Sequence, residues 1–237
     1  MNGGKTVGVL GGMGPMATVE FFRRLVAATP ADTDQEHLHI LIDNDPGVPD
    51  RTCAILHGGP SPVGALAAMA RRLEGAGSDL LAMPCNTAHV FLEQIRKAVS
   101  IPVLDMIREA ADAVDRPSVG LLATDGTIRT GLYQRACAAR GVRVMVPGPG
   151  DQRVVMEAIA RVKRGEDPRR LGSHLGSIVR RLADGGAEAV VAGCTELSLV
   201  PGDGMAVAWI DALDCLVAAA LREARSDIRK RSGKEAK

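Results

Sequence analysis

An internal repeat limits the fold of this chain more than any other feature of its sequence. At an offset of 109 positions, the difference between 194 and 85, residues 71–85 align without a gap on residues 180–194. Each copy begins with Arg-Arg-Leu, passes through a glycine and a short apolar run, and ends at a cysteine, Cys85 or Cys194. Polar residues follow both cysteines. A repeat of this length indicates two copies of one structural unit.

Two further blocks extend the repeat in the same order. The segment Val7-Gly8-Val9-Leu10 matches Val119-Gly120-Leu121-Leu122 at an offset of 112, and on that offset Phe21 pairs with Tyr133. The segment Val103-Leu104-Asp105 resembles Trp209-Ile210-Asp211. We therefore expect two α/β units, each presenting a cysteine at the carboxyl end of a strand.

Short apolar runs alternate with segments of helical spacing, which predicts parallel sheets flanked by helices. Expected strands cover residues 5–10, 37–43, 79–83, 101–105 and 142–146, with a further strand ending at Cys194. Expected helices cover 16–29, 63–74, 88–98, 106–115, 132–139, 151 or 152 to 164, and 169–183. Ligands of such sheets bind at the carboxyl ends of strands. The loops expected there are 11–15, 44–52, 84–87, 124–127, 147–151 and 193–196, facing one another across a cleft between the units.

Composition narrows the class of partner. The chain holds 29 Lys and Arg against 28 Asp and Glu, and only 2% of its residues are aromatic. This balance argues against a nucleic-acid or membrane surface, which needs a basic excess. Five cysteines without a CxxC pair are typical of a reducing compartment. With no leader-like segment and no apolar run of about 20 residues, we expect a cytoplasmic protein.

The turn Gly11-Gly12-Met13-Gly14-Pro15 leaves two interpretations open. A strand, a glycine turn and a helix form the usual phosphate cradle, yet the spacing fits neither common nucleotide motif. The turn serves either as a ligand cradle or as a tight connection that lets the helix pack on the strand.

The paired cysteines indicate acid–base chemistry. Inverting a tetrahedral carbon needs a base on one face and an acid on the other, and a thiol can perform both roles. The alternative is that both are small buried residues, the usual fate of free cysteine. Cys53, Cys137 and Cys215 have no repeat partner and are interpreted as structural. His89 is either a packing group or a group that tunes the thiol of Cys85, and the ligand spacing does not favour a metal site.

At this point the motifs resemble those of the aspartate/glutamate racemases, and most closely their aspartate racemase branch. The resemblance extends to about residue 215, and its carriers are the segments 11–18, 48–52, 84–89, 123–127 and 193–197. It implies cofactor-independent isomerases, a homodimer, and two α/β domains related by a pseudo-twofold axis with the site between them. On this basis the first domain is expected at 1–100 plus 206–237 and the second at 101–205.

The resemblance also implies roles for individual residues. Cys85 and Cys194 would be the acid/base pair, and the substrate would be a small amino acid. Asn86, Thr87 and Thr195 would offer donors to its α-carboxylate, and Glu196 would hold the ammonium. Thr124 and Thr127 would join the binding set from the turn of the second unit that matches the glycine turn. Arg51 would grip a side-chain carboxylate. Met13 and Lys163 complete the expected binding set. Alternatively, Arg51 forms a loop salt bridge and Lys163 lies on a solvated helix face.

The expected reaction is PLP-independent racemisation of aspartate, or of glutamate. Two alternatives stay open: a related isomerase such as a hydantoin racemase or maleate isomerase, and a homologue that binds a small molecule without turnover. Ser198 and Thr130 depart from residues common in the family, which leaves substrate preference more open than mechanism. The basic tail from Ser226 to Lys237 is expected to be a solvated end.

Overall fold

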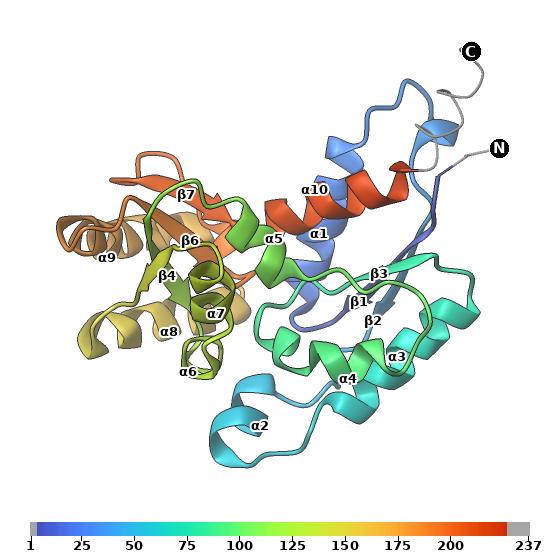
Figure 1. Cartoon of the computed structure of the whole chain (residues 1–237), viewed down its shortest axis with the longest axis horizontal. Helices are drawn as coiled ribbons and strands as arrows, with labels where there is room; N and C mark the ends of the chain where they lie inside the picture. The colour runs from blue at the N-terminus through green and yellow to red at the C-terminus, as the bar shows by residue number, and fades with distance from the viewer. Residues whose placement is uncertain (1–3, 227–237) are drawn as a thin grey trace.

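The computed structural model describes residues 4–226, and its strands form two separate parallel sheets (Figure 1). The first sheet has the order β2-β1-β3, with β1 at Val7–Gly11, β2 at Ile40–Asn44 and β3 at Leu80–Ala82. The second has the order β5-β4-β6-β7, with β4 at Ser118–Ala123, β5 at Arg143–Met145, β6 at Ala189–Gly193 and β7 at Ala208–Asp211. The expected α/β fold with parallel sheets is confirmed. The basic tail beyond Ser226 lies outside the described residues.

The strand registers of the two sheets match the sequence repeat. Val7 lies opposite Leu80 in the first sheet, and Val119 lies opposite Ala189 in the second. These four positions are related by the same offsets of 112 and 109 that align the sequence. An isolated bridge between Leu81 and Val103 occupies the place that β7 has beside β6. The two halves of the chain therefore fold as two copies of one unit.

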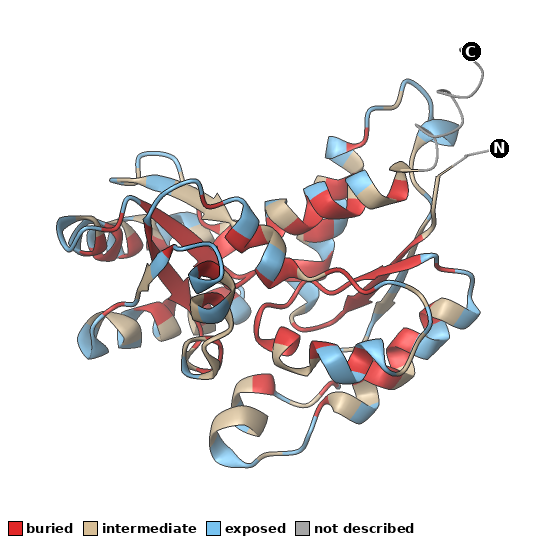
Figure 2. Ribbon diagram, viewed as in Figure 1, coloured by how far each residue is buried: buried red, intermediate tan, exposed pale blue. Residues whose placement is uncertain are grey.

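Helices cover both sheets and bury the strands β1, β3, β4 and β6, whereas β2, β5 and β7 are partly exposed (Figure 2). The helices are α1 (Pro15–Ala28), α2 (Arg51–His57), α3 (Val63–Gly75), α4 (Leu92–Arg96), α5 (Met106–Asp112), α6 (Asp125–Thr130), α7 (Leu132–Ala138), α8 (Pro149–Lys163), α9 (Gly172–Asp184) and α10 (Ala212–Ala224). Short 3-10 turns lie at Asp34–Glu36, Thr87–Phe91, Pro168–Leu171 and Leu197–Leu199.

Several sequence expectations differ from the structure at element ends. Helix α2 was not expected; it begins where the side chain of Asp50 accepts a hydrogen bond from the backbone N–H of Cys53. The expected helix 88–98 is a 3-10 turn followed by the short α4. The expected strand 101–105 makes only a single bridge, and Pro102 there has no N–H to offer to a ladder.

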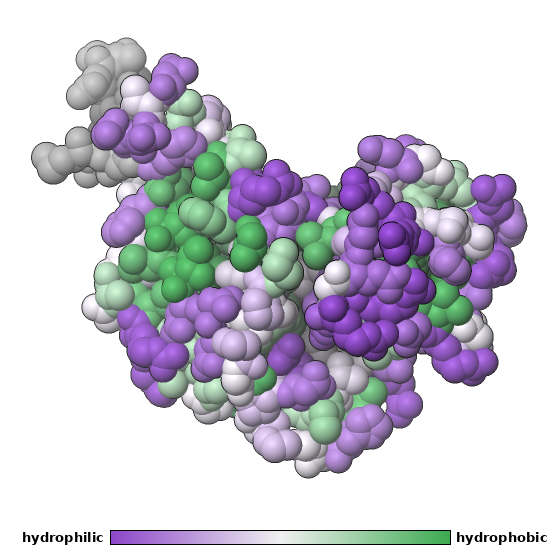
Figure 3. Space-filling view, turned by 180° about the vertical axis from the view of Figure 1, so that it is seen from behind, coloured by the Kyte–Doolittle hydropathy of each residue, from purple (hydrophilic) through white to green (hydrophobic). Residues whose placement is uncertain are grey.

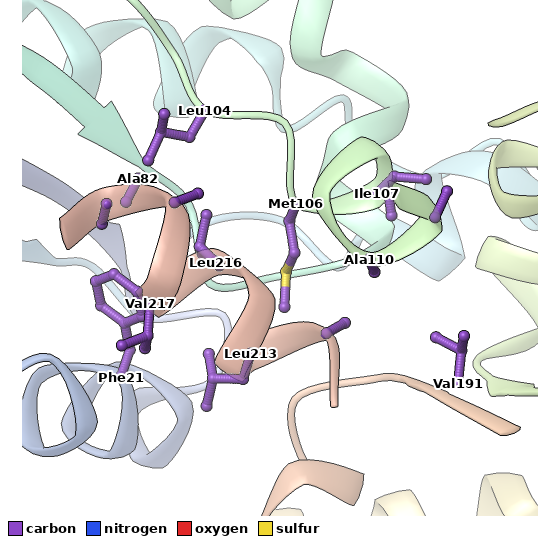
Figure 4. Packing of buried hydrophobic residues seen from close by; sticks show 14 of the residues in the cluster. Phe21, Ala82, Leu104, Met106, Ile107, Ala110, Val191, Leu213, Leu216 and Val217 are labelled. Atoms are coloured by element: carbon purple, nitrogen blue, oxygen red, sulfur yellow. The ribbon is translucent and has the colours of Figure 1, made fainter. Parts of the chain in front are cut away.

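A shared apolar core joins the two units. Helix α10, the last of the second unit, packs against α1 of the first, while α5 packs against α7 of the second. Leu213, Leu216 and Val217 of α10 lie between Phe21 of α1 and Met106 of α5 (Figure 4). The last helix of each unit thus covers a helix of the other unit, α10 on α1 and α5 on α7, as a pseudo-twofold relation requires.

The strand pairings of Val103 and of β7 indicate where the two domains meet along the chain. Val103 lies beside β3 of the first sheet, whereas β7 belongs to the second. We propose domain limits near residues 105 and 211 in place of 100 and 205, so that the first domain comprises 4–105 plus α10.

Asp105 and Asp211 cap α5 and α10 at equivalent positions, but their replacement by alanine is expected to lower the free energy of unfolding by different amounts. Asp105 caps α5 by accepting from the N–H groups of Ile107 and Arg108. Asp211 caps α10 at the N–H of Leu213 and also accepts from Arg24 of α1 at 2.6 Å. Asp105→Ala is expected to lower the free energy of unfolding by about 1 kcal/mol. Asp211→Ala should lower it by about 2–3 kcal/mol, because a partly buried ion pair is lost as well.

Urea unfolding would measure both effects. The variant Asp211→Asn keeps a capping oxygen while removing the charge, so its stability should fall between that of the wild type and that of Asp211→Ala. Equal losses for the two alanine variants would contradict the role given to the ion pair between Arg24 and Asp211.

Candidate active site

The two repeat cysteines lie in loops that follow equivalent strands. Cys85 comes three residues after the end of β3, and Cys194 directly follows the end of β6. Each is buried, with 5% of its surface exposed. β3 and β6 each belong to a parallel sheet, and each cysteine follows the last residues of its strand. Both cysteines therefore lie at the carboxyl ends of strands, as expected.

Three threonine hydroxyls connect the loops of the two units. Thr87 Oγ1 lies 2.9 Å from Thr124 Oγ1 and 3.0 Å from Thr127 Oγ1, and those two are 3.1 Å apart. Gly126 permits this approach, since a Cβ there would lie 3.1 Å from a methyl carbon of Thr87. The Cys85 loop of the first unit is thus bonded to the amino-terminal turn of α6 in the second.

Cys194 is paired with a carboxylate. Its thiol donates to Glu196 Oε2 at 2.9 Å. Burial and the negative charge of Glu196 raise the pKa of the Cys194 thiol well above its ordinary value. Cys194 therefore holds its proton at neutral pH and is suited to the role of proton donor. Glu196, expected to hold a ligand ammonium, therefore also contacts this thiol.

Lys163 lies at the last position of α8 and faces Glu196. Its Nζ is 3.9 Å from Glu196 Oε1, and the side chain is 42% exposed. Burial lowers the pKa of Lys163, but Glu196 and the thiols of Cys194 and Cys85 outweigh this effect, so the pKa is raised overall. The ammonium stays charged and close enough to interact with both thiols, in place of lying on a wholly solvated helix face.

Arg51 begins α2 and is held by backbone oxygens. Its Nη1 donates to the carbonyls of Val48 and Pro49, and its Nη2 donates to that of Met13 at 3.4 Å. Its Nε is buried and has no partner within residues 4–226. The alternative interpretation, a loop salt bridge, is not seen among those residues, because carbonyls and not carboxylates receive these bonds. A guanidinium carries five N–H groups, so donors remain for an anion.

Asn86 is held by a residue that the sequence interpretation did not include. Tyr133 of α7 donates its hydroxyl proton to Asn86 Oδ1 at 2.5 Å. The other end of the amide, Nδ2, is buried without a partner in the described chain. The pairing of Tyr133 with Phe21 in the repeat was the available signal, because one copy carries a hydroxyl that the other lacks.

His89 connects the Cys85 loop to α5 through both ring nitrogens. The N–H of Met106 donates to Nε2 at 3.1 Å, so Nε2 carries no proton. Nδ1 therefore donates to the carbonyl oxygen of Cys85 at 2.8 Å. Burial lowers the pKa of His89, which keeps the ring neutral. Of the two interpretations, the packing role fits: the ring contacts the Cys85 backbone and its bonds do not involve the thiol.

The remaining predicted residues also lie in this region. Met13 and Thr195 are buried, and a Cβ on Gly14 would lie 3.6 Å from Glu196 Oε1, so the glycine turn faces the Cys194 loop. Of the unpaired cysteines, Cys137 is buried in the core and Cys215 packs against it, whereas Cys53 is exposed. Within residues 4–226, no three His, Cys, Asp or Glu side chains are grouped to hold a metal ion, and no helix is long and apolar enough to cross a bilayer.

Comparison with known proteins gives one consistent family. A family model described as Asp/Glu/hydantoin racemase matches residues 10–220. The structure of an aspartate racemase from Picrophilus torridus superposes with a TM-score of 0.84 at 31% identity, covering 93% of this chain and 94% of that one. The broad specificity amino-acid racemase RacX of Bacillus subtilis is 29% identical over 210 residues, 82% of this chain and 86% of the relative. A glutamate racemase from Francisella tularensis, solved with D-glutamate, shares the fold at 19% identity and a TM-score of 0.64, covering 91% of this chain and 79% of that one.

The contact between Cys194 and Glu196 predicts a change in thiol reactivity. Glu196→Gln removes the carboxylate charge that helps to raise the pKa of Cys194, so that pKa should fall. The rate of Cys194 alkylation by iodoacetamide, followed against pH by peptide mass spectrometry, should then rise at lower pH than in the wild type.

A matched control uses the opposite end of the same strand. Glu188 is exposed and precedes β6, so Glu188→Gln changes the net charge by the same amount away from the thiol. Its alkylation profile should equal that of the wild type. An unchanged profile in Glu196→Gln would mean that the carboxylate does not control this thiol.

Proposed function

Since this chain belongs to the Asp/Glu/hydantoin racemase family, we propose that it inverts the α-carbon of an acidic amino acid with one cysteine on each face. The observation that carries the proposal is the pair Cys85 and Cys194. They occupy equivalent loops of the two units, and the Cys85 loop is bonded to the second unit through Thr87 and Thr124, which caps α6.

The proposed reaction has two balanced proton transfers. A thiolate on one face removes the α-proton, so an S–H bond forms, the C–H bond breaks and the electron pair spreads onto the α-carboxylate. The thiol on the other face then donates its proton to the carbon and becomes a thiolate. Product and substrate differ only in configuration. Cys194, which holds its proton beside Glu196, is suited to donate first.

The unsatisfied donors of the site support an anionic substrate. The α-proton of an amino acid is only weakly acidic, so fixed donors must stabilise the charge that develops on the carboxylate. Asn86 Nδ2 and Arg51 Nε are buried N–H donors without partners in residues 4–226. A buried donor without a partner is costly, and a bound carboxylate would remove this cost. Lys163 adds a positive charge close to both thiols.

Two relatives favour different substrate ranges. Similarity to the aspartate racemase of Picrophilus torridus supports aspartate as the substrate of this chain. Similarity to the broad specificity amino-acid racemase of Bacillus subtilis supports a wider set of amino acids. We propose aspartate as the preferred substrate, because Arg51 and Lys163 place two cations in this region and a second carboxylate would pair with one of them.

Incubation in D2O tests the proposal. Purified protein without added cofactor is expected to convert L-aspartate to D-aspartate, followed by chiral chromatography and mass spectrometry. On initial turnover the D-enantiomer should carry α-deuterium while remaining L-aspartate keeps its proton, because different thiols act on the two faces. Cys85→Ala and Cys194→Ala should each lower the rate of inversion by about three orders of magnitude or more.

The control is Cys137→Ala, which removes a buried thiol in the core. The rate of inversion per amount of folded protein should equal that of the wild type. Activity that survives in Cys85→Ala or Cys194→Ala would contradict the two-thiol reaction. Inversion of neutral amino acids with none of aspartate would refute the acidic substrate, and turnover of hydantoins or maleate alone would assign the chain to another reaction of this fold.

We also propose that two copies of the chain associate through α1 and β2. Met16, Val19 and Phe22 recur at helical spacing on α1 and are exposed, as is Ile42 on the edge strand β2. Figure 3 shows one broad gathering of hydrophobic residues on the face seen from behind. Burial of such a surface against its own copy would form a self-complementary interface.

A charged substitution tests this association by light scattering coupled to gel filtration. Phe22→Glu, at a side chain that is 42% exposed, is expected to convert a dimer into a monomer. Val154→Glu is the control, because Val154 is also apolar and 40% exposed but lies on α8. A monomeric wild type, or dissociation by Val154→Glu to the same extent, would refute the assigned interface.

A further inference from the structure

Tyr133 touches both cysteine loops at once. Its side chain is 1% exposed and lies on α7 of the second unit. At one end, its hydroxyl donates to Asn86, the residue that follows Cys85. At its side, its ring packs on Gly193, the residue that precedes Cys194: a Cβ on Gly193 would lie 3.1 Å from Tyr133 Cε2. One rigid side chain thus spans the distance between the two loops.

The hydroxyl exists on one side of the repeat only. The equivalent residue of the first unit is Phe21, which is fully buried and carries no hydroxyl. The residue after Cys194 is Thr195 where the residue after Cys85 is Asn86. Packing alone therefore accounts for an aromatic ring at both positions, but it does not account for a phenol at position 133.

The hydrogen bond determines the orientation of an amide. An asparagine side chain can present either its oxygen or its NH2 group in a given direction. The buried hydroxyl of Tyr133 needs an acceptor for its proton, and Asn86 Oδ1 provides it at 2.5 Å. Burial raises the pKa of Tyr133 well above its ordinary value, so the phenol keeps this proton. The NH2 group must then point away from Tyr133, and there it is buried without a partner in the described chain.

We propose that Tyr133 is a positioning residue that orients Asn86 so that its Nδ2 donates to the substrate carboxylate, and that it holds the two cysteine loops at a defined separation. This inference rests on the proposed racemase function. Tyr133 does not itself contact the reacting carbon; it acts through Asn86 and Gly193. The effect of its hydroxyl should therefore appear only while Asn86 can donate, whereas its ring contacts Gly193 independently of Asn86.

A double-mutant cycle on kcat/KM for aspartate tests the first part. Tyr133→Phe keeps the ring and removes the hydroxyl, and it is expected to lower kcat/KM by about tenfold. Asn86→Ala should lower it at least as far. The double variant Tyr133→Phe/Asn86→Ala should be no slower than Asn86→Ala, because the hydroxyl has no amide left to orient. Independent effects that multiply, or an unchanged kcat/KM in Tyr133→Phe, would overturn the proposal.

A matched control separates orientation from general loss of a buried hydrogen bond. Ser118 is buried on β4, at the strand end opposite to the site, and its hydroxyl donates to the carbonyl of Gly186. Ser118→Ala should leave the kcat/KM of the folded protein unchanged. A second variant, Asn86→Asp, can still accept from Tyr133 but cannot donate, so it should lose more activity than Asn86→Ala through repulsion of the carboxylate. Asn86→Asp activity equal to the wild type would refute donation by Nδ2.

An NMR measurement decides the orientation without turnover. The side-chain amide signals of Asn86, assigned by their loss in Asn86→Ala, should move in Tyr133→Phe and stay in place in Ser118→Ala. If wild-type protein does not racemise aspartate, the proposed function fails, while these signals still report whether Tyr133 orients Asn86. Identical Asn86 amide signals in wild type and Tyr133→Phe would overturn the positioning role in either case.

Discussion

The arrangement of the whole molecule depends on the apolar contact between α5 and α10. These two helices end the first and second copies of the repeat, and α10 packs against α1 of the first copy while α5 packs against α7 of the second. Every fully buried Leu or Phe in such a core contributes about 1.5–3 kcal/mol, so separation of the units would expose much of the stabilising surface. Because the core joins both sheets, the strand ends that carry Cys85 and Cys194 stay in a constant relation. A site made of two loops from different units needs such a constraint before any polar contact can be specific.

The polar contacts make the two halves of the site chemically unequal. On one side, the thiol of Cys194 donates to Glu196, which in turn faces Lys163. On the other side, His89 donates to the carbonyl oxygen of Cys85 and Tyr133 donates to the side chain of Asn86. Neither contact involves the Cys85 thiol. The repeat supplies two similar loops, and the side chains that differ between the two copies surround the two thiols with different polar groups. A reaction that starts with one thiol and one thiolate requires such a difference, although the chain uses the same residue type on both faces.

Much of this fold could be predicted because the repeat is visible in the sequence. The offsets that align Val7 with Val119 and Cys85 with Cys194 are the same offsets that relate the strand registers. The loops that carry site residues followed from the rule for parallel sheets. Contacts between units could not be predicted, because nothing local in the sequence indicates that Tyr133 meets Asn86 or that Thr87 meets Thr124. Short elements were also missed: α2 depends on the cap at Asp50, and the expected helix after Cys85 begins as a 3-10 turn whose first bond joins His89 to Asn86. The contacts of Arg51 with three backbone carbonyls could not be foreseen either, because they depend on how its loop folds back on the glycine turn.

In the reaction that we propose, the substrate α-carbon lies between the side chains of Cys85 and Cys194. A crystal structure of the Cys85→Ser/Cys194→Ser variant with L-aspartate measures this directly, because the variant should bind the ligand without turning it over. We expect the α-carbon between the two serine hydroxyls, one on each face, with the α-carboxylate accepting from Asn86 Nδ2. Aspartate bound with both hydroxyls on the same face of the α-carbon, or bound away from the loops of Cys85 and Cys194, would contradict it.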